Sequence, residues 1–340
     1  MKSITAKILT FIGGLVAIAM VLVAIITNIF VTKVVTNDQN YIMQDGNTKT
    51  VLYIENYFVK YINIVQQMSR DKNIIKILSS DINFDNYIES PNYNDTYSIL
   101  GSTTDSDSQN ISMAYIAKLG TNVAFDGKGW TGGREYNLTE KDYWISDSNN
   151  IAKGFQISEP YKDANTGEMV STVSTVVYDE NGSNIVGVAA IDIKVSTICD
   201  MVINTESLYE TGYQTLISKE GYVLAHKNPE NILKKYTEIG FDSNMTGELE
   251  NSSGQVFDFV DTEGKSYSVV DTEKNSGWKV ANIVPFDEYN ESTNSIMRTL
   301  VIINVVSIIA IILVILFITK NISKPLRKLT GIIDQLTGGD

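Results

Sequence analysis

Residues 158–193 have the sequence SEPYKDANTGEMVSTVSTVVYDENGSNIVGVAAIDI, which is the stretch that best predicts the fold. Two runs within it, Met169 to Tyr178 and Asn184 to Ile193, are rich in Val, Ile, Thr and Ala. They flank the turn sequence Asp-Glu-Asn-Gly at 179–182. Because β-branched residues favour strands and Asn-Gly favours a tight turn, this stretch predicts an antiparallel hairpin.

Shorter strand-like runs separated by turn residues lie on both sides of the hairpin. A helical stretch, Val195 to Asn204, divides them into two sets, which predicts two similar α+β modules in tandem. The stretch Ser90 to Asn110 is rich in Asn, Asp, Ser and Thr and is predicted to be a loop. The other strands expected are Met113–Lys118 and Gly154–Ile157 in the first module, and Tyr213–Ser218, Tyr222–His226, Gln255–Val260, Ser266–Asp271 and Trp278–Val284 in the second.

A long helix is expected before the strands, because apolar residues repeat there every seven positions in two offset series. The series are Val51, Phe58 and Val65, and Ile54, Tyr61 and Met68. Two interpretations are open: the seam packs on the chain's own domain, or it forms a homodimer with a second copy. The two can hold together.

Two stretches, Ile8 to Phe30 and Leu300 to Ile318, are apolar and carry no charge. As helices they would be about 34 and 28 Å long, enough to span a hydrocarbon core of about 30 Å. The first has an alternative interpretation as a cleaved signal peptide, with Ala17 and Ala19 at the cleavage spacing. Its apolar run continues to Ile26, however, which is typical of an anchor.

Basic residues flank both apolar stretches and predict that both termini are cytoplasmic. They are Lys2, Lys7, Lys320, Lys324, Arg327 and Lys328. The expected protein is a two-pass protein of the plasma membrane with an extracytoplasmic region between the spans. The predicted parts are a cytoplasmic N-terminus (1–7), transmembrane helix 1 (8–30), the extracytoplasmic domain (31–297, with a long helix at 31–80, a membrane-distal module at 81–205 and a membrane-proximal module at 206–297), transmembrane helix 2 (298–319) and a cytoplasmic segment (320–340).

Composition argues against several classes of function. The chain has 27 Lys and Arg against 40 Asp and Glu, a net charge of −13, which should repel nucleic acid. The single cysteine, Cys199, allows no intrachain disulfide, and the single histidine, His226, makes a Cys/His zinc site implausible and removes the usual general base. Because the chain also lacks G-x-S-x-G and HExxH motifs, we expect neither an enzyme nor a cofactor.

The order of these parts resembles that of double-Cache (dCache) receptors, in which two PAS-like modules follow a long helix between two membrane spans. Residues 158–193 are similar to the core of that family's first module; TLISKEGYVLAHKNPENIL (215–233) and SGWKVANIVP (276–285) resemble its second. NISKPLRKLTGIIDQLTGGD (321–340) resembles the start of a HAMP linker, with Pro325, Gly339 and Asp340 at the matching places.

The resemblance implies a sensor region of the methyl-accepting chemotaxis type that acts on cytoplasmic signalling proteins. A histidine kinase or a diguanylate cyclase as the output stays open, and nothing in the sequence chooses between them. An anchored extracytoplasmic enzyme and an adhesion or scaffold module are further alternatives.

Residues Tyr136 to Asp192 carry the candidate ligand site. Asp192 ends an apolar row on one face of a predicted strand, and a buried charge there needs a partner, such as a ligand cation. Tyr161 and Asp163 share one face if extended. The adjacent aromatics Tyr143 and Trp144, together with acids, suit an ammonium group.

The resemblance implies roles for these residues. In dCache receptors for amino acids, a Tyr-x-Asp and an Asp at a strand end hold the amino group; Tyr161, Asp163 and Asp192 match them. The carboxylate is held by a Tyr and an Arg-x-Trp-Tyr segment, where this chain has Tyr136 and the run Lys141-Asp142-Tyr143-Trp144. Since Lys lacks the bidentate fork of Arg, the expected ligand is an amine, an amino acid, a modified amino acid or a short peptide. His226 is expected to be structural.

Overall fold

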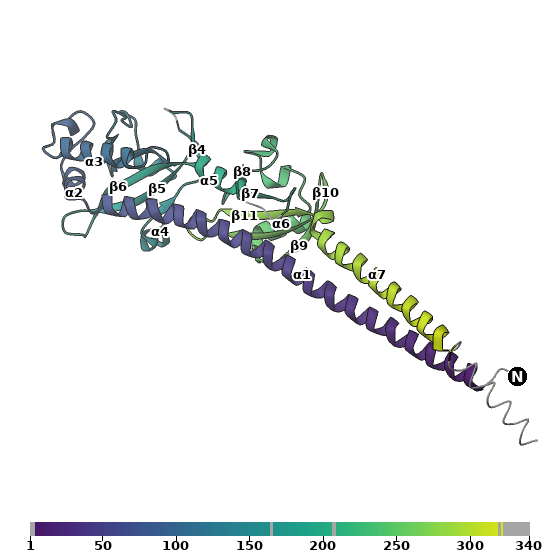
Figure 1. The fold of residues 1–340 in the computed structure, drawn as a ribbon. Coiled ribbons are helices and arrows are strands. Elements are labelled where there is room, and N and C mark those ends of the chain that lie inside the picture. The colour runs from purple at the N-terminus through teal and green to yellow at the C-terminus, as the bar shows by residue number, and fades with distance from the viewer. Residues whose placement is uncertain (1–3, 164–165, 206–208, 319–320, 322–340) are drawn as a thin grey trace, which may run out of the picture. The chain divides into compact units, whose positions relative to one another are not determined.

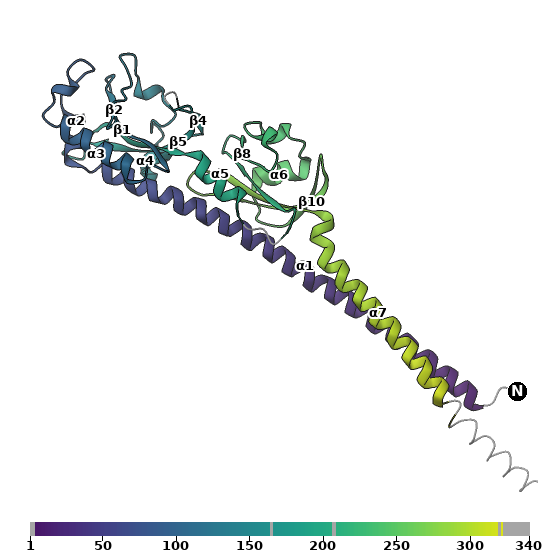
Figure 2. The ribbon, with the colours of Figure 1, turned by 45° about the horizontal axis from the view of Figure 1, so that its top comes forward.

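The structure is a computed structural model that describes residues 4–163, 166–205, 209–318 and 321. Its first element is the long helix α1 (Ile4–Met68), and its last is α7 (Phe286–Ile318). Between them lie two antiparallel sheets, each accompanied by short helices (Figures 1 and 2). The α+β fold class predicted from the sequence, with two modules behind a long helix, is confirmed.

The first module is built on a six-stranded antiparallel sheet in which the predicted hairpin is central. The order is β2-β1-β6-β5-β3, with β4 also pairing with β5. Helices α2 (Lys72–Ser79) and α3 (Tyr93–Ser106) pack on this sheet. The strands are β1 (Ile111–Lys118), β2 (Ala124–Asp126), β3 (Gln156–Ile157), β4 (Tyr161–Lys162), β5 (Met169–Tyr178) and β6 (Ile185–Lys194), and a short helix α4 (Ser148–Lys153) precedes β3.

The second module repeats the plan with five antiparallel strands in the order β8-β7-β11-β10-β9. Helix α5 (Val195–Ile203) leads from the first sheet and packs on β7 and β8, and α6 (Ser243–Asn251) packs on β9. The strands are β7 (Tyr213–Ile217), β8 (Val223–Ala225), β9 (Phe257–Asp261), β10 (Gly264–Thr272) and β11 (Lys279–Pro285). Single 3-10 turns lie at Tyr87–Glu89, Leu138–Glu140, Pro229–Asn231 and Tyr236–Glu238.

The heptad seam of α1 is buried in the core of its own domain. Phe58, Tyr61 and Val65 have no exposed surface and belong to one apolar cluster with residues of both sheets. The Phe58 ring meets Trp278 of the second module edge to face, with centroids 5.2 Å apart. Of the two interpretations of the seam, packing on the chain's own modules is therefore the one observed. Phe58 and Val65 are covered within the chain itself, and a dimer through this helix stays a prediction.

Two expected local features differ in the structure. The stretch predicted as a loop contains α3, whose buried side is made by Thr96, Leu100 and Thr104. Two of these three are threonines, so the helix lacks an apolar stripe. A close approach fixes it in place: a Cβ added to Gly127, which follows β2, would lie 1.9 Å from the Gly101 backbone nitrogen. In addition, the long helix ends at Met68, before the expected residue 80, and α2 begins anew behind the N-cap Asp71.

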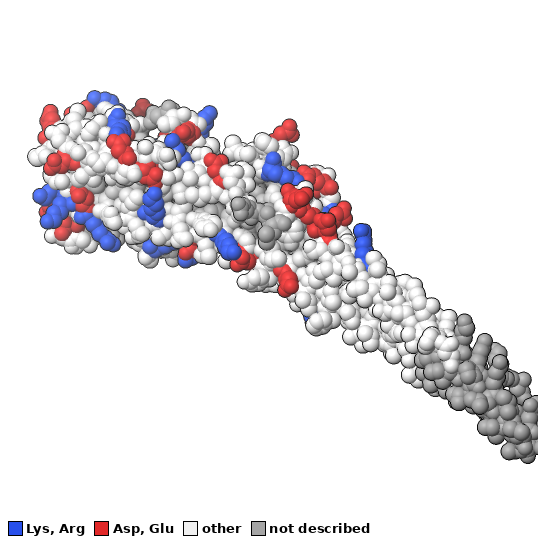
Figure 3. All heavy atoms as spheres, viewed as in Figure 1, with Lys and Arg blue, Asp and Glu red and all other residues white. Residues whose placement is uncertain are grey.

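The described structure divides into two compact units, residues 42–286 and a second unit that contains the first part of α1 and α7 from Asp287. In this second unit Gln39 Nε2 donates to the Tyr289 carbonyl oxygen (2.6 Å), and the Tyr289 hydroxyl donates to Asn40 Oδ1 (2.6 Å). Both helices are long and apolar enough to cross a membrane. Figure 3 shows a largely uncharged surface on the visible face of α7, where side chains such as Val306 and Leu313 are exposed. Residues 322–340, with the HAMP-like motif, lie outside the described residues, as does Lys2.

Candidate functional site

The first module contains a cavity of about 480 Å³ on the face of its sheet that carries Met113, Tyr115 and Asp192. Strands β1, β4 and β6 form one side of it, and the chain between β2 and α4 forms the other. The lining residues are Met113, Tyr115, Trp130, Gly132, Tyr136, Glu140, Lys141, Asp142, Tyr143, Tyr161, Asp163 and Asp192. Six of the seven site residues predicted from the sequence are therefore brought together here.

Asp192 lies at the base of the cavity on a central strand of the sheet. Cross-strand pairing places it between Met113 of β1 and Thr172 of β5, and 1% of its surface is exposed. Its Oδ1 accepts a hydrogen bond of 2.6 Å from Thr172 Oγ1. Burial raises the pKa of this carboxyl to about 6, although hydrogen bonds from Thr172 and Tyr161 oppose the shift. Among the described residues, hydroxyl groups stabilise its charge and no Lys, Arg or His forms an ion pair with it.

Tyr161 and Asp163 lie beside Asp192, as the Tyr-x-Asp spacing predicts. Tyr161 belongs to β4 and its hydroxyl lies 2.9 Å from Thr172 Oγ1, which in turn contacts Asp192. Asp163 follows β4 and is 6% exposed; its Oδ1 accepts hydrogen bonds from the Thr166 amide (2.6 Å) and hydroxyl (3.1 Å). The negative charge of Asp163 contributes to the raised pKa of Asp192. Two carboxylates thus face one cavity.

Four aromatic rings make the walls of the cavity. Tyr115 lies edge to face with Trp130 (5.5 Å between centroids) and with Tyr143 (5.6 Å). The hydroxyls of Tyr136 and Tyr143 are hydrogen-bonded at 2.8 Å, and burial raises the pKa of both phenols, that of Tyr143 to about 12. Both therefore stay protonated at neutral pH. An aromatic box next to carboxylates is the arrangement that attracts an ammonium group.

Tyr115 contributes an unpartnered polar atom to this box. The side chain is 1% exposed, and its hydroxyl is near enough to Asp192 to lower the pKa of that carboxyl. Yet among the described residues it makes no hydrogen bond of acceptable geometry. A buried hydroxyl without a partner costs free energy, and a polar group of a ligand would remove that cost.

The part of the cavity expected to bind a ligand carboxylate offers fewer charged partners than the acidic part. Lys141 lies at the mouth, with its Nζ 5.3 Å from the centre of the Tyr136 ring, and its side chain is exposed. Trp144, the seventh predicted residue, does not line the cavity: it is half-buried and packs against the apolar cluster that contains Tyr136 and Tyr143. Since the lining contains Glu140, Asp142, Asp163 and Asp192 against one lysine, the cavity favours cations.

Sequence reasoning missed Met113, Tyr115 and Trp130. Met113 and Tyr115 share one face of a strand that was predicted, and Asp192 pairs with Met113. The two-residue spacing of Met113 and Tyr115 shows that they share a strand face. That this face also carries Asp192 becomes clear only when the order of the strands is known. Trp130 is positioned by Asp126, whose Oδ1 accepts from the backbone nitrogens of Lys128 (2.9 Å) and Trp130 (2.8 Å). The Asp-Gly dipeptide at 126–127 is a local turn signal, but it does not indicate that Trp130 lines the cavity.

A second cavity of about 480 Å³ adjoins the first. It is lined by Ser112, Met113, Asp126, Lys128, Gly129, Trp130, Thr131, Asp163 and Thr166. Met113, Trp130 and Asp163 line both cavities, so the two share a common border. The Lys128 ammonium forms an ion pair with Asp105 at 2.6 Å.

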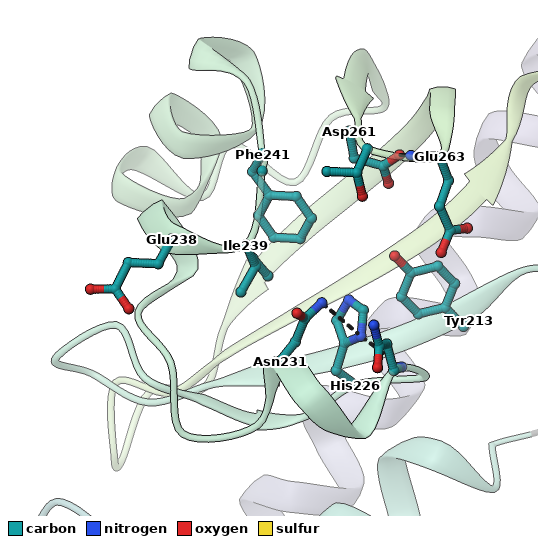
Figure 4. Close-up of a pocket in the computed structure, with 11 residues that line it drawn as sticks. Tyr213, His226, Asn231, Glu238, Ile239, Phe241, Asp261 and Glu263 are labelled. Carbon is teal, nitrogen blue, oxygen red and sulfur yellow. Dashed lines mark hydrogen bonds between the residues drawn. The ribbon is translucent and has the colours of Figure 1, made fainter.

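A third cavity, of about 290 Å³, lies in the second module around His226 (Figure 4). His226 Nδ1 accepts a hydrogen bond from the Asn228 backbone nitrogen (2.9 Å), and its ring meets Tyr213 edge to face at 5.2 Å. Burial lowers the pKa of this histidine, so it is neutral at pH 7 with its proton on Nε2. Its backbone contact and burial support the structural role predicted for it. Within the described residues no group of three or more His, Cys, Asp or Glu is placed to hold a metal ion.

Comparison with known proteins agrees with the fold. The Cache domain family (dCache_1) matches residues 30–293. The chain therefore belongs to the Cache domain family. The methyl-accepting chemotaxis protein McpB of Bacillus subtilis is 28% identical over 203 residues, which are 58% of this chain and 28% of that protein. The chain thus spans less than a third of the length of the curated relatives it matches.

Two solved structures share the fold. The sensory domain of the Campylobacter jejuni chemoreceptor Tlp3 with isoleucine bound has a TM-score of 0.58 and 14% identity, over 77% of this chain and 98% of that one. The ligand-binding domain of the Pseudomonas aeruginosa amino acid chemoreceptor PctC in complex with GABA has a TM-score of 0.51 and 18% identity, over 72% and 99%. At these identities the likeness concerns the fold.

Proposed function

We propose that this chain is the sensory part of a transmembrane chemoreceptor and that its first module binds a small ligand with a protonated amine. The observation that carries the proposal is Asp192, a carboxylate 1% exposed at the base of a cavity, whose partners within the described part of the chain are hydroxyl groups and no cation. An ammonium group placed there would supply the missing charge. It would also lie among aromatic rings, which stabilise cations further.

Asp192, Asp163 and Tyr161 would bind the amine, and Tyr136, Tyr143 and Lys141 would contact the rest of the ligand. Solved relatives of the same fold hold isoleucine, GABA or asparagine, which all carry an amino group. Lys141 offers a carboxylate only one exposed point charge, which supports amines as well as amino acids as ligands. Trp144 would act indirectly, by supporting the tyrosine wall from behind.

The chain's architecture suggests how binding would be signalled. β11 ends at Pro285 and α7 starts at Phe286, so no loop separates the second sheet from the second apolar helix. We propose the membrane topology described above, with residues 31–297 outside and 320–340 as the start of a HAMP linker. A coupling free energy of about 1–3 kcal/mol between ligand binding and the position of α7 is typical of such receptors. Chemotaxis is the favoured output because the curated relatives are named chemotaxis proteins.

A homodimer is proposed through the outer face of α1, in place of the heptad seam. Within residues 42–68 this face exposes Leu52 (48%), Tyr53 (60%) and Val59 (37%). Helical residues seven apart lie on one face, so Leu52 and Val59 form one apolar stripe that a second copy of α1 would cover. Action on cytoplasmic signalling proteins is proposed as the output, because the curated relatives are named chemotaxis proteins.

The function is tested by the melting temperature of the full chain in detergent, measured with a panel of amino acids and simple amines. A ligand at about 100 times its dissociation constant should add about 2.7 kcal/mol to the free energy of unfolding. Asp192→Asn keeps the shape of the side chain and removes its charge, so it should abolish the increase. If no amine or amino acid raises the melting temperature, or if a hit binds Asp192→Asn at full affinity, the proposal is wrong.

A further inference from the structure

We propose that the cavity beside the amine site is a second cation subsite, centred on Asp126, and that the two together select an extended diamine. This inference rests on the proposed function and adds to it the chemical class of the ligand. It starts from the border that the two cavities share at Met113, Trp130 and Asp163.

The sheet places Asp126 and Asp192 on the same face. Tyr115 pairs with Asp126 of β2, Met113 pairs with Asp192 of β6, and Met113 and Tyr115 are two residues apart on β1. Paired residues project to the same side of a sheet, as do residues i and i+2. Both carboxylates are buried, with 4% and 1% of their surfaces exposed.

The pairing register also gives the distance between them. Asp126 and Asp192 lie two strands apart and are offset by two residues, so their Cα atoms are about 12 Å apart. Because both side chains stand on the same face of the sheet, their carboxyl groups are separated by a similar distance. A charge-assisted hydrogen bond of about 2.8 Å at each end then leaves about 6 Å between two ammonium nitrogens. That is the length of an extended chain of four methylene groups.

The cavity surface between Asp126 and Asp192 suits a chain of methylene groups. Met113 and Trp130 line both cavities and offer an apolar path, and Asp163 adds a third negative charge at the border. The one lysine that lines the second cavity, Lys128, is engaged by Asp105 at 2.6 Å. The unpartnered Tyr115 hydroxyl, 1% exposed, lines the first cavity on the same sheet face and would accept from an ammonium group.

Asp126 also has a structural task, which the experiment has to separate from binding. Its Oδ1 caps the turn by accepting from the Lys128 and Trp130 amides. In Asp126→Asn the side-chain oxygen keeps these bonds, and only the charge is lost. Asp179 is a matched control: it caps the exposed hairpin turn with Oδ1, accepting from the Ser183 amide at 2.8 Å, and lies outside both cavities.

The test is isothermal titration of the full chain in detergent with 1,4-diaminobutane and with butylamine, which lacks the second amine. We expect the diamine to bind about tenfold to a hundredfold more tightly, the usual contribution of one charged hydrogen bond. Asp126→Asn should remove this advantage and leave butylamine binding unchanged, while Asp179→Asn should change neither. Equal affinity of the two probes, or an equal loss of both in Asp126→Asn, overturns the second subsite and leaves the amine site standing. If neither these probes nor any amino acid binds, the proposed function fails as well.

Discussion

Asp192 should make both stability and ligand binding depend on pH. Burial raises its pKa in the folded state to about 6, above the ordinary value of 3.8. The folded protein therefore takes up a proton that the unfolded chain takes up only at lower pH. The unliganded protein should gain stability as pH falls from about 6 towards 4, by up to about 3 kcal/mol. Denaturant melts across this range should show the gain, and Asp192→Asn should lack it.

Amine affinity should change in the opposite direction, because only the charged carboxylate attracts a cation. Below the folded pKa of about 6, each unit of pH should weaken amine binding by about tenfold. Titration calorimetry at several pH values measures this slope. An affinity that stays constant from neutral pH down to about 5 contradicts a binding role for ionised Asp192.

Lys141 should distinguish ligands by their carboxylate. Because its side chain is exposed and offers one point charge, Lys141→Ala should weaken 4-aminobutanoate by about twofold to fivefold, the usual range for an exposed ion pair. Butylamine, which differs only in lacking the carboxylate, should bind unchanged. Equal losses for both compounds would mean that Lys141 acts by shaping the cavity.

At the scale of elements, α1 presents two faces that should respond differently to substitution. Phe58 has no exposed surface and packs on Trp278. Phe58→Ala should therefore lower the free energy of unfolding by about 3–5 kcal/mol. Leu52→Ala, on the outer face at 48% exposure, should change it by no more than about 0.5 kcal/mol. Chemical denaturation of both variants compares the two faces directly.

The outer face is also where the proposed dimer is tested. Leu52→Asp should leave the melt of the monomer nearly unchanged and reduce cross-linking between copies, because a charge would enter the apolar stripe with Val59. Ile88→Asp is the control, since Ile88 is an apolar side chain of similar exposure (57%) that lies in a 3-10 turn outside α1. Undiminished cross-linking in Leu52→Asp would argue for contact through another surface.

The elements also show which parts of the fold a sequence reveals. The limits of β5 were predicted to the residue and those of β6 within one residue, because alternation and the Asn-Gly turn are local signals. Helix α3 was missed because its buried side carries threonines, one of which has a tertiary partner: Thr104 Oγ1 accepts from the Ala114 amide of β1 and donates to the Leu100 carbonyl within the helix. Such partners are set by the fold and leave no periodic pattern.

Some residues of the candidate site could likewise be predicted from the sequence, and others could not. Tyr161, Asp163 and Asp192 lie on or next to strands, where residue spacing is a local signal, and they were predicted from the sequence. Tyr115 and Trp130 reach the cavity through cross-strand pairing and through the turn capped by Asp126. The cross-strand pairs join residues that can be far apart in sequence, so a single sequence holds no local signal for them. The turn at Asp126 is local, but its sequence does not show that Trp130 lines the cavity.

For the whole molecule, we expect residues 33–297, without the apolar helices, to fold as a soluble unit. Residues 42–286 form one compact unit in which both sheets share an apolar core with α1. The fragment should show a mixed helix and strand circular dichroism spectrum and a single cooperative melt. An insoluble fragment, or one without a folded spectrum, would contradict the proposed domain limits.

The residues that line the cavity come partly from hydrogen-bonded strands and partly from irregular chain, and this difference has an evolutionary consequence. The amine-facing acids Asp163 and Asp192 stand on or beside the hydrogen-bonded strands β4 and β6, whereas Tyr136, Lys141 and Tyr143 stand on the irregular chain between β2 and α4. Substitutions in irregular chain are tolerated more easily than in a central strand. Over evolution, the ligand specificity of such a protein can therefore change through substitutions in the irregular chain, while Asp163 and Asp192 stay unchanged.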